Sequence, residues 1–242
     1  EYPVDDESCF LTSADTVFEQ EAVRLHRARR IEPLWREQNG AVRIWERRIN
    51  GRPYVIFVDP SEGLPQSNWQ AAAVLDCERL KYVATLRVKT DIPDLAKRVF
   101  DLGMAYNEAL MMVERNNHGH ALLHILDAQM GYPNMYYHDG SDFSQTHQLG
   151  WPTTVKTKSI MVFEFKELFE AGAVEVHDED ALRELGAYRY IPTGGRGGQD
   201  KYQAPHGGTD DLVIAHMGAV MGRHLAYVAH QSKPVRYGGL AG

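Results

Sequence analysis

The sequence predicts an α/β domain with a mixed sheet, in which an antiparallel meander passes into parallel strands and helices flank the sheet. Three apolar stretches, residues 54–59, 69–75 and 82–88, are separated by turns, and the short polar link between the last two favours an antiparallel hairpin. Residues 92–106 then have helical spacing. Residues 109–114 form a short apolar run that ends in an acid, typical of a parallel strand buried on both faces. This order of elements predicts helices packed against both faces of one sheet.

An extra hairpin is expected before the meander. Asn50-Gly51 is a strong signal for a tight turn between residues 42–46 and residues 47–54. A helix that ends near residue 38 is expected upstream of it, with Thr12 or Ser13 as its N-cap.

A helix and a further α/β stretch are expected after residue 114. Asn117 is predicted to cap a helix over residues 117–126. The rest is expected as a strand at 135–138, a helix at 154–169, a strand at 173–176, a helix at 180–185, a strand at 187–191 and a last helix at 210–229.

Composition limits the class of protein. With 242 residues, 43% apolar and 24% charged, the chain can bury a large core and is not expected to be disordered. Cys9 and Cys77 have no metal-finger spacing, which favours two reduced thiols. No apolar run reaches the roughly 18 residues that span a bilayer, and the acidic start is unlike a signal peptide, so we expect no membrane association and no secretion. The chain lacks an initiator Met and is expected to be a fragment of a longer protein or a processed product.

The charge is unevenly distributed. The chain carries −7, but residues 24–52 contain nine arginines and three glutamates, so this segment carries +6 and the remainder −13. Arginine makes forked contacts with phosphates, which makes the segment a candidate nucleic-acid contact. The alternative is a solvated helix face followed by a polar strand.

Acidic residues stand where three apolar runs begin or end. Asp59 ends one predicted strand, Glu114 ends another, and Asp210-Asp211 precede the last helix. Carboxylates that meet at one edge of a sheet repel one another unless cations lie between them. Hard oxygen ligands suit Mg²⁺ or Mn²⁺, and such sites cut phosphodiesters with two metal ions.

Each of these acids also has a structural explanation. Asp59 precedes Pro60 and could serve a turn, Glu114 could pair with Arg115, and either Asp210 or Asp211 could be a helix N-cap. Glu114 is the hardest to explain structurally, because a carboxylate at the end of a buried strand is costly unless it is paired or coordinating.

Other motifs are weaker. His118, His120 and His124 lack the cysteine or HExxH context of a zinc site. The glycine-rich residues 194–198 lack the GxxxxGK[ST] pattern, so no ATP-binding P-loop is expected.

With these acids in view, the chain resembles the C-terminal nuclease domain of phage large terminase subunits. Four segments carry the resemblance: residues 57–63 (FVDPSEG), 113–119 (VERNNHG), 150–158 (GWPTTVKTK) and 207–215 (GGTDDLVIA). The similarity extends over residues 40–230. It implies a ribonuclease H-like fold: a mixed five-stranded-type sheet flanked by helices, with an extra hairpin and a C-terminal α/β insertion. Residues 1–40 would then be a joining segment or the tail of an upstream ATPase domain, and residues 41–242 the nuclease domain.

The resemblance also implies a site. Asp59, Glu114 and Asp211 carry over as catalytic metal ligands for two Mg²⁺ or Mn²⁺ ions, with Asp210 as a neighbour that binds or tunes the second metal. Members often carry a further acid after the first motif, where this chain has Asn68. The second acid is Glu in only part of the family, and its longer side chain could alter metal preference.

The implied activity is endonucleolytic cutting of concatemeric viral double-stranded DNA during genome packaging in the cytoplasm of a phage-infected bacterium. The implied partners of the full-length protein are an N-terminal packaging ATPase, a small terminase subunit and a portal. Basic residues are expected to hold the DNA backbone, namely Arg47, Arg48, Arg196 and Lys201. No base-reading motif is present, so little sequence specificity is expected.

Two other functions fit the same residues. Another ribonuclease H-like nuclease, such as a junction resolvase or an exonuclease, would use the same carboxylates. A non-catalytic module that binds DNA or a portal would use the acids only structurally.

Overall fold

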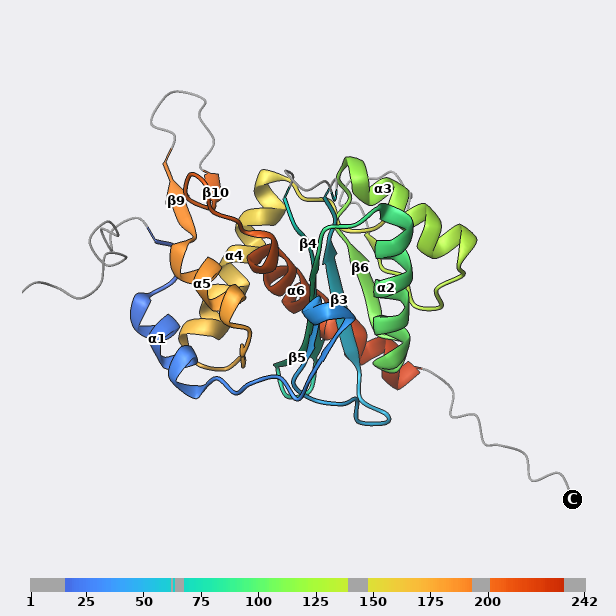
Figure 1. Ribbon diagram of the computed structural model, residues 1–242, viewed down its shortest axis with the longest axis horizontal. Helices are drawn as coiled ribbons and strands as arrows, with labels where there is room; N and C mark the ends of the chain where they lie inside the picture. Colours follow the sequence, from blue (N-terminus) through green and yellow to red (C-terminus); the bar gives the residue numbers. More distant parts are fainter. Residues whose placement is uncertain (1–15, 62, 64–67, 139–147, 193–200, 233–242) are drawn as a thin grey trace, which may run out of the picture.

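A central sheet with helices on both faces organises the molecule (Figure 1). The computed structural model describes residues 16–61, 63, 68–138, 148–192 and 201–232. Within those residues, no helix is long and apolar enough to cross a membrane.

The main sheet has six strands in the order β1-β2-β5-β4-β3-β6. The strands β3, β4 and β5 form the predicted antiparallel meander, and β6 lies parallel to β3, as expected. The strands are β1 (Trp35–Glu37), β2 (Val42–Ile44), β3 (Tyr54–Asp59), β4 (Gln70–Asp76), β5 (Lys81–Val88) and β6 (Leu110–Val113).

The predicted hairpin around Asn50-Gly51 is wrong. A turn is present, with Gly51 at φ +83° and the Arg52 amide donating to the Ile49 carbonyl, but it does not join paired strands. β2 pairs instead with β1 and β5, on the far side of the meander from β3. A turn signal identifies a local chain reversal, whereas the strand pairing depends on distant residues.

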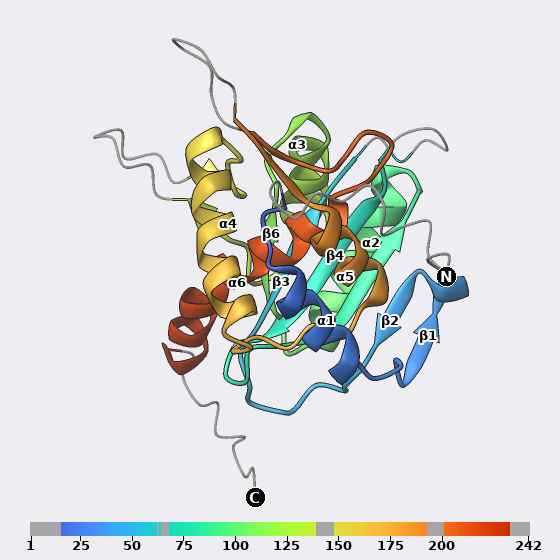
Figure 2. The ribbon, with the colours of Figure 1, turned by 90° about the vertical axis from the view of Figure 1, so that its left-hand side faces the viewer.

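Helices cover the two faces of the sheet in separate groups. Figure 2 shows α1, α4, α5 and α6 gathered on one face, and α2 and α3 lie on the other. The helices are α1 (Gln20–Arg29), α2 (Ile92–Ala105), α3 (Asn117–His124), α4 (Val155–Glu170), α5 (Glu179–Ala187) and α6 (Asp211–Ser232), and a π-helical turn, Ile125–Gln129, follows α3.

Several boundaries differ from the predictions. The first helix ends at Arg29, and the chain then forms the edge strand β1. Residues 173–176 form no strand, although Glu175 makes one isolated parallel bridge to Lys81. The remaining strands form two small antiparallel pairs: β7 (Tyr137–His138) with β8 (Gln148–Leu149), and β9 (Arg189–Ile191) with β10 (Lys201–Gln203). Thr12 and Ser13 lie outside the described residues.

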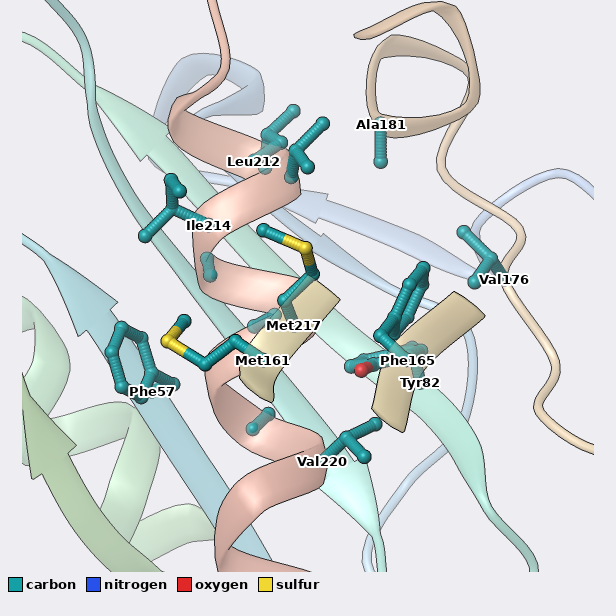
Figure 3. Packing of buried hydrophobic residues seen from close by; sticks show 14 of the residues in the cluster. Phe57, Tyr82, Met161, Phe165, Val176, Ala181, Leu212, Ile214, Met217 and Val220 are labelled. Carbon is teal, nitrogen blue, oxygen red and sulfur yellow. The ribbon is translucent and has the colours of Figure 1, made fainter. Parts of the chain in front are cut away.

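The core has two parts, one on each face of the sheet. On the α6 face, residues of β3, α4 and α6 interdigitate (Figure 3). α6 lies close to β3 because Gly218 faces the Phe57 ring, where a Cβ would come within 2.3 Å of that ring. The last helix is thereby fixed against the strand that ends at Asp59.

Candidate metal centre

Four carboxylates line one pocket at the end of the sheet. Val58 of β3 lies beside Val113 of β6 in the parallel register, so Asp59 and Glu114 emerge at the same edge. Asp210 and Asp211 reach that edge from the start of α6. The pocket has a volume of about 450 Å³, and its polar lining is Asp59, Ser61, Asn68, Glu114, Asn116, Asn117, His118, Lys158, Asp210 and Asp211.

These carboxylates are electrostatically strained. Burial raises the pKa of Asp59 well above its ordinary value, and the neighbouring charges of Glu114, Asp211 and Asp210 raise it further. Burial raises the pKa of Asp211 to about 7, with added repulsion from Glu184 and Asp210. Burial also raises the pKa of Asp210. A positive charge placed among these groups would favour their ionised forms.

Backbone contacts hold Glu114 beside Asp59. The Glu114 amide donates to the Val58 carbonyl at 2.9 Å, and the Arg115 amide donates to the Trp151 carbonyl at 2.7 Å. The backbone just after β6 is therefore hydrogen-bonded to β3 on one side and to Trp151 on the other. These bonds fix the position of Glu114 at the end of the strand.

Asn116 joins the two loops that carry Asp59 and Glu114. Its side-chain amide donates to the Pro60 carbonyl at 3.0 Å and to the Glu114 carboxylate at 3.3 Å. Its side-chain oxygen accepts from the Gly119 amide, so the cap of α3 is Asn116 and the predicted cap at Asn117 is wrong by one residue. A Cβ on Gly119 would lie 1.9 Å from the Glu114 carbonyl oxygen, which requires glycine there.

Lys158 and the start of α6 complete the pocket. Lys158, from the first turn of α4, lies with its Nζ 3.9 Å from the Asp210 carboxylate. Asp211 is 3% exposed, and its Oδ2 has no hydrogen-bond partner among the described residues. A buried carboxylate oxygen without a donor is costly unless a cation or proton satisfies it.

The donor set fits a hard divalent cation. Four carboxylates, together with the Asn68 side chain in the same lining, offer the oxygen ligands that suit Mg²⁺ and Mn²⁺. In the described part of the chain, no three His, Cys, Asp or Glu side chains are grouped closely enough to hold a metal ion.

The residues predicted to contact DNA do not lie together in the structure. Lys201 lines a hollow of about 330 Å³ that shares Lys158 with the carboxylate pocket. Arg47 and Arg48 are exposed at the opposite end of the sheet, where Arg47 stacks on Trp35 and Arg48 donates to the Ala105 carbonyl. They do not join this site, and a DNA contact by them stays a prediction. Arg196 and the glycine-rich residues 194–198 lie outside the described residues.

Most of the basic segment is used within the domain. Six of its nine arginines form ion pairs with carboxylates of this chain: Arg24, Arg27, Arg30, Arg36, Arg43 and Arg52. The alternative to a nucleic-acid contact, in which these arginines serve the domain itself, therefore accounts for most of this positive charge.

Sequence reasoning missed Lys158 and Asn116 as parts of the site. Lys158 is the last residue of segment 150–158, and Asn116 lies within segment 113–119, two residues after Glu114. Both residues thus belong to segments that carry the resemblance, but no role was predicted for either. Asn68 lies in the pocket lining, where the resemblance expects an acid, and His118 lines it without the other two histidines, which are exposed.

Comparison with known proteins identifies the fold. The sequence matches no protein-family model, and no curated protein matches it. The large terminase nuclease from thermophilic phage G20c matches with a TM-score of 0.65 and 22% identity, covering 86% of this chain and 98% of that one. The large terminase nuclease domain of Thermus phage P74-26 matches with a TM-score of 0.62 and 22% identity, covering 90% and 97%. The human cytomegalovirus terminase nuclease domain matches with a TM-score of 0.51 and 14% identity, covering 87% and 97%.

The chain therefore has the fold of the large terminase nuclease, a ribonuclease H-like α/β fold, as the resemblance implied. The mixed sheet, the flanking helices and the small hairpins agree with that expectation, and the sheet has six strands rather than five.

Proposed function

We propose that this domain is a metal-dependent DNA endonuclease. The observation that carries the proposal is the convergence of Asp59, Glu114, Asp210 and Asp211, from three separate segments, on one pocket at the end of the sheet. The fold supports it, because solved terminase nucleases of the same fold include a magnesium-bound form and a manganese-soaked form.

The residues would divide the work as follows. Two bound Mg²⁺ or Mn²⁺ ions would activate a water and stabilise the leaving 3′ oxygen of a phosphodiester. Asp59, central among the acids, would contact both ions, and Glu114 and Asp211 would hold one each. Asp210, beside Lys158, would tune or complete the second position, and both Asp210 and Asp211 remain candidates for the third ligand.

The substrate would be double-stranded DNA held through its backbone. Lys158 lines both the carboxylate pocket and the hollow that contains Lys201. The two lysines would therefore contact successive phosphates of the DNA backbone as it leaves the carboxylates. Contacts of this kind are independent of sequence and weaken steeply with salt.

The biological setting would be packaging of a phage genome. In the full-length protein an upstream ATPase domain would move concatemeric DNA, and the small terminase subunit and portal would be its partners in the cytoplasm of the infected cell. Residues 1–40 would join the two domains, although α1 and β1 pack on the nuclease side, against α5 and β2 respectively.

Supercoiled plasmid provides the direct test. We expect the purified domain to convert it to open-circular and linear forms in Mn²⁺ or Mg²⁺, and EDTA to stop the conversion. Cutting restricted to four-way junctions or free ends would favour a resolvase or exonuclease. Binding of DNA with no cutting at any metal concentration would favour a non-catalytic module and contradict the proposal.

A further inference from the structure

The first turn of α6 is capped by a residue from another helix. The Leu212 and Val213 amides donate to the Glu184 carboxylate of α5, at 2.9 and 3.3 Å. These are the second and third residues of α6, whose amides are usually bound by the side chain of the N-cap residue. The Ile214 amide donates to the Asp210 carbonyl, which places Asp210 at the N-cap position.

This exchange frees the acidic pair for another role. An aspartate at an N-cap normally turns its carboxylate back onto the helix amides. Here each of those two amides has its single proton directed at Glu184, so Asp210 and Asp211 are not needed as caps. Both instead line the pocket that also contains Asp59 and Glu114.

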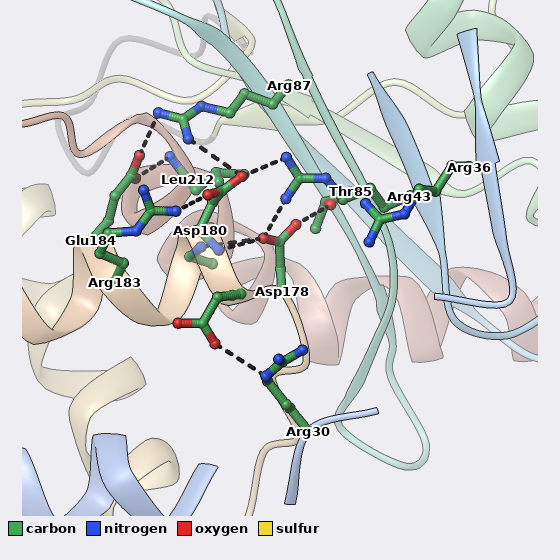
Figure 4. A network of polar contacts seen from close by, with 12 residues as sticks. Arg30, Arg36, Arg43, Thr85, Arg87, Asp178, Asp180, Arg183, Glu184 and Leu212 are labelled. Carbon is green, nitrogen blue, oxygen red and sulfur yellow. Dashed lines mark hydrogen bonds and ion pairs between the residues drawn. The ribbon is translucent and has the colours of Figure 1, made fainter. Parts of the chain in front are cut away.

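A network of ion pairs holds Glu184 in place (Figure 4). The Arg87 guanidinium contacts the Glu184 carboxylate at 2.9 Å, and the Thr209 hydroxyl donates to the same oxygen at 2.7 Å. Arg87 also pairs with Asp180 at 3.7 Å, and Asp180 pairs with Arg43 of β2. Glu184 is 7% exposed, so these contacts are shielded from solvent.

We infer that Glu184 is a positioning residue for the metal site. By capping α6 in place of Asp210, it keeps the Asp210 and Asp211 carboxylates available to the pocket. The inference rests on the proposed function, because it assigns Glu184 a role in the same site. Glu184 itself is not part of the pocket lining, and its two oxygens are occupied by Leu212, Val213, Thr209 and Arg87.

Three variants of the whole chain test this role by calorimetric titration of Mn²⁺ into DNA-free protein. Glu184→Ala removes the cap, so Asp210 is expected to turn onto the helix amides and Mn²⁺ affinity to fall about 10- to 100-fold, as for other residues that orient metal ligands. Glu184→Gln keeps one oxygen that can accept from the amides, so we expect an affinity between those of wild type and Glu184→Ala.

Glu164→Gln is the matched control. Glu164 also tethers α6 through an ion pair, with Arg223 at 2.8 Å, but at a residue near the middle of the helix, away from Asp211. We expect Mn²⁺ affinity equal to wild type in this variant. Amide hydrogen exchange at Leu212 and Val213, which lose the buried Glu184 acceptor, should change in Glu184→Ala and stay as in wild type in Glu164→Gln.

The outcomes separate this inference from the proposed function. If wild type binds Mn²⁺ and Glu184→Ala binds it with equal affinity, only the positioning role of Glu184 is overturned. Wild type that binds no Mn²⁺ would overturn both. If Glu184→Ala does not fold, the comparison of Glu184→Gln with Glu164→Gln decides, and equal affinities would overturn the inference.

Discussion

At the scale of single residues, the defining feature is a set of buried acids with raised pKa values. Burial raises the pKa values of Asp59, Asp210 and Asp211, and repulsion from neighbouring acids adds to the shift of each. Proteins retain such strain mainly where it serves a function. The proposed cations would relieve it, which links stability to metal and to pH.

Stability of the metal-free protein should therefore fall with rising pH. The folded state holds the Asp211 proton up to about pH 7, whereas the unfolded chain releases it near the ordinary value of 3.8. Folding is then linked to proton uptake in this window, so the stabilising effect of the proton, present below pH 4, is lost as the pH rises to 7. Urea unfolding in EDTA between pH 4 and pH 8 measures this.

Asp211→Asn should be more stable than wild type in EDTA at pH 8. The amide removes the buried charge, and we expect a gain on the order of a few kcal/mol in the free energy of unfolding. Mn²⁺ should stabilise wild type more than this variant. A variant that is less stable than wild type under these conditions would mean that Asp211 is satisfied without a cation.

At the scale of elements, the close contact of α6 with β3 relates Asp211 to Asp59. Gly218 brings the helix against the Phe57 ring, and Gly222, one turn on, faces Met112 and Val55. Because Asp59 and Asp211 lie at the same end of these two elements, the helix-to-strand distance bears directly on the site.

Gly218→Ala should destabilise the fold and weaken metal binding together. The added Cβ would lie 2.3 Å from the Phe57 ring, so helix and strand must separate, at a cost of about 1–3 kcal/mol. Gly186→Ala is the matched control, since this helical glycine has its nearest contact at 3.4 Å. Thermal unfolding and Mn²⁺ titration of both variants measure the effect; equal behaviour of the two would contradict it.

The elements differ in how far the sequence could predict them. The meander, β6 and α2 follow from apolar periodicity, which burial imposes along each segment. The pairing of β2 with β5, the end of α1 at Arg29 and the edge strand β1 depend on contacts with distant segments. Local patterns contain no information on those partners.

At the scale of the whole molecule, the net charge of −7 opposes DNA binding, and most arginines of the basic segment form ion pairs within the domain. The proximity of Asp59 and Glu114 could be predicted from the sequence, because parallel strands end at the same edge of a sheet. The capping by Glu184 could not, since it joins residues from α5 and α6 whose approach only the tertiary fold sets.

Lys201→Gln should weaken duplex DNA binding and reduce its salt dependence. Lys201 lines the hollow beside the carboxylate pocket, and loss of one phosphate contact lowers the slope of log affinity against log salt by about 1. Lys97→Gln, an exposed lysine of α2 on the other face, serves as control. Fluorescence anisotropy over a salt series measures both, and identical slopes would remove Lys201 from the DNA path.

The four carboxylates at the end of the sheet are proposed to form a two-metal site. Anomalous diffraction from crystals soaked in Mn²⁺ would locate the ions. We predict two peaks about 4 Å apart, bound by Asp59, Glu114 and the Asp210-Asp211 pair. Manganese bound only elsewhere, or no peak in this pocket at saturating Mn²⁺, would contradict it.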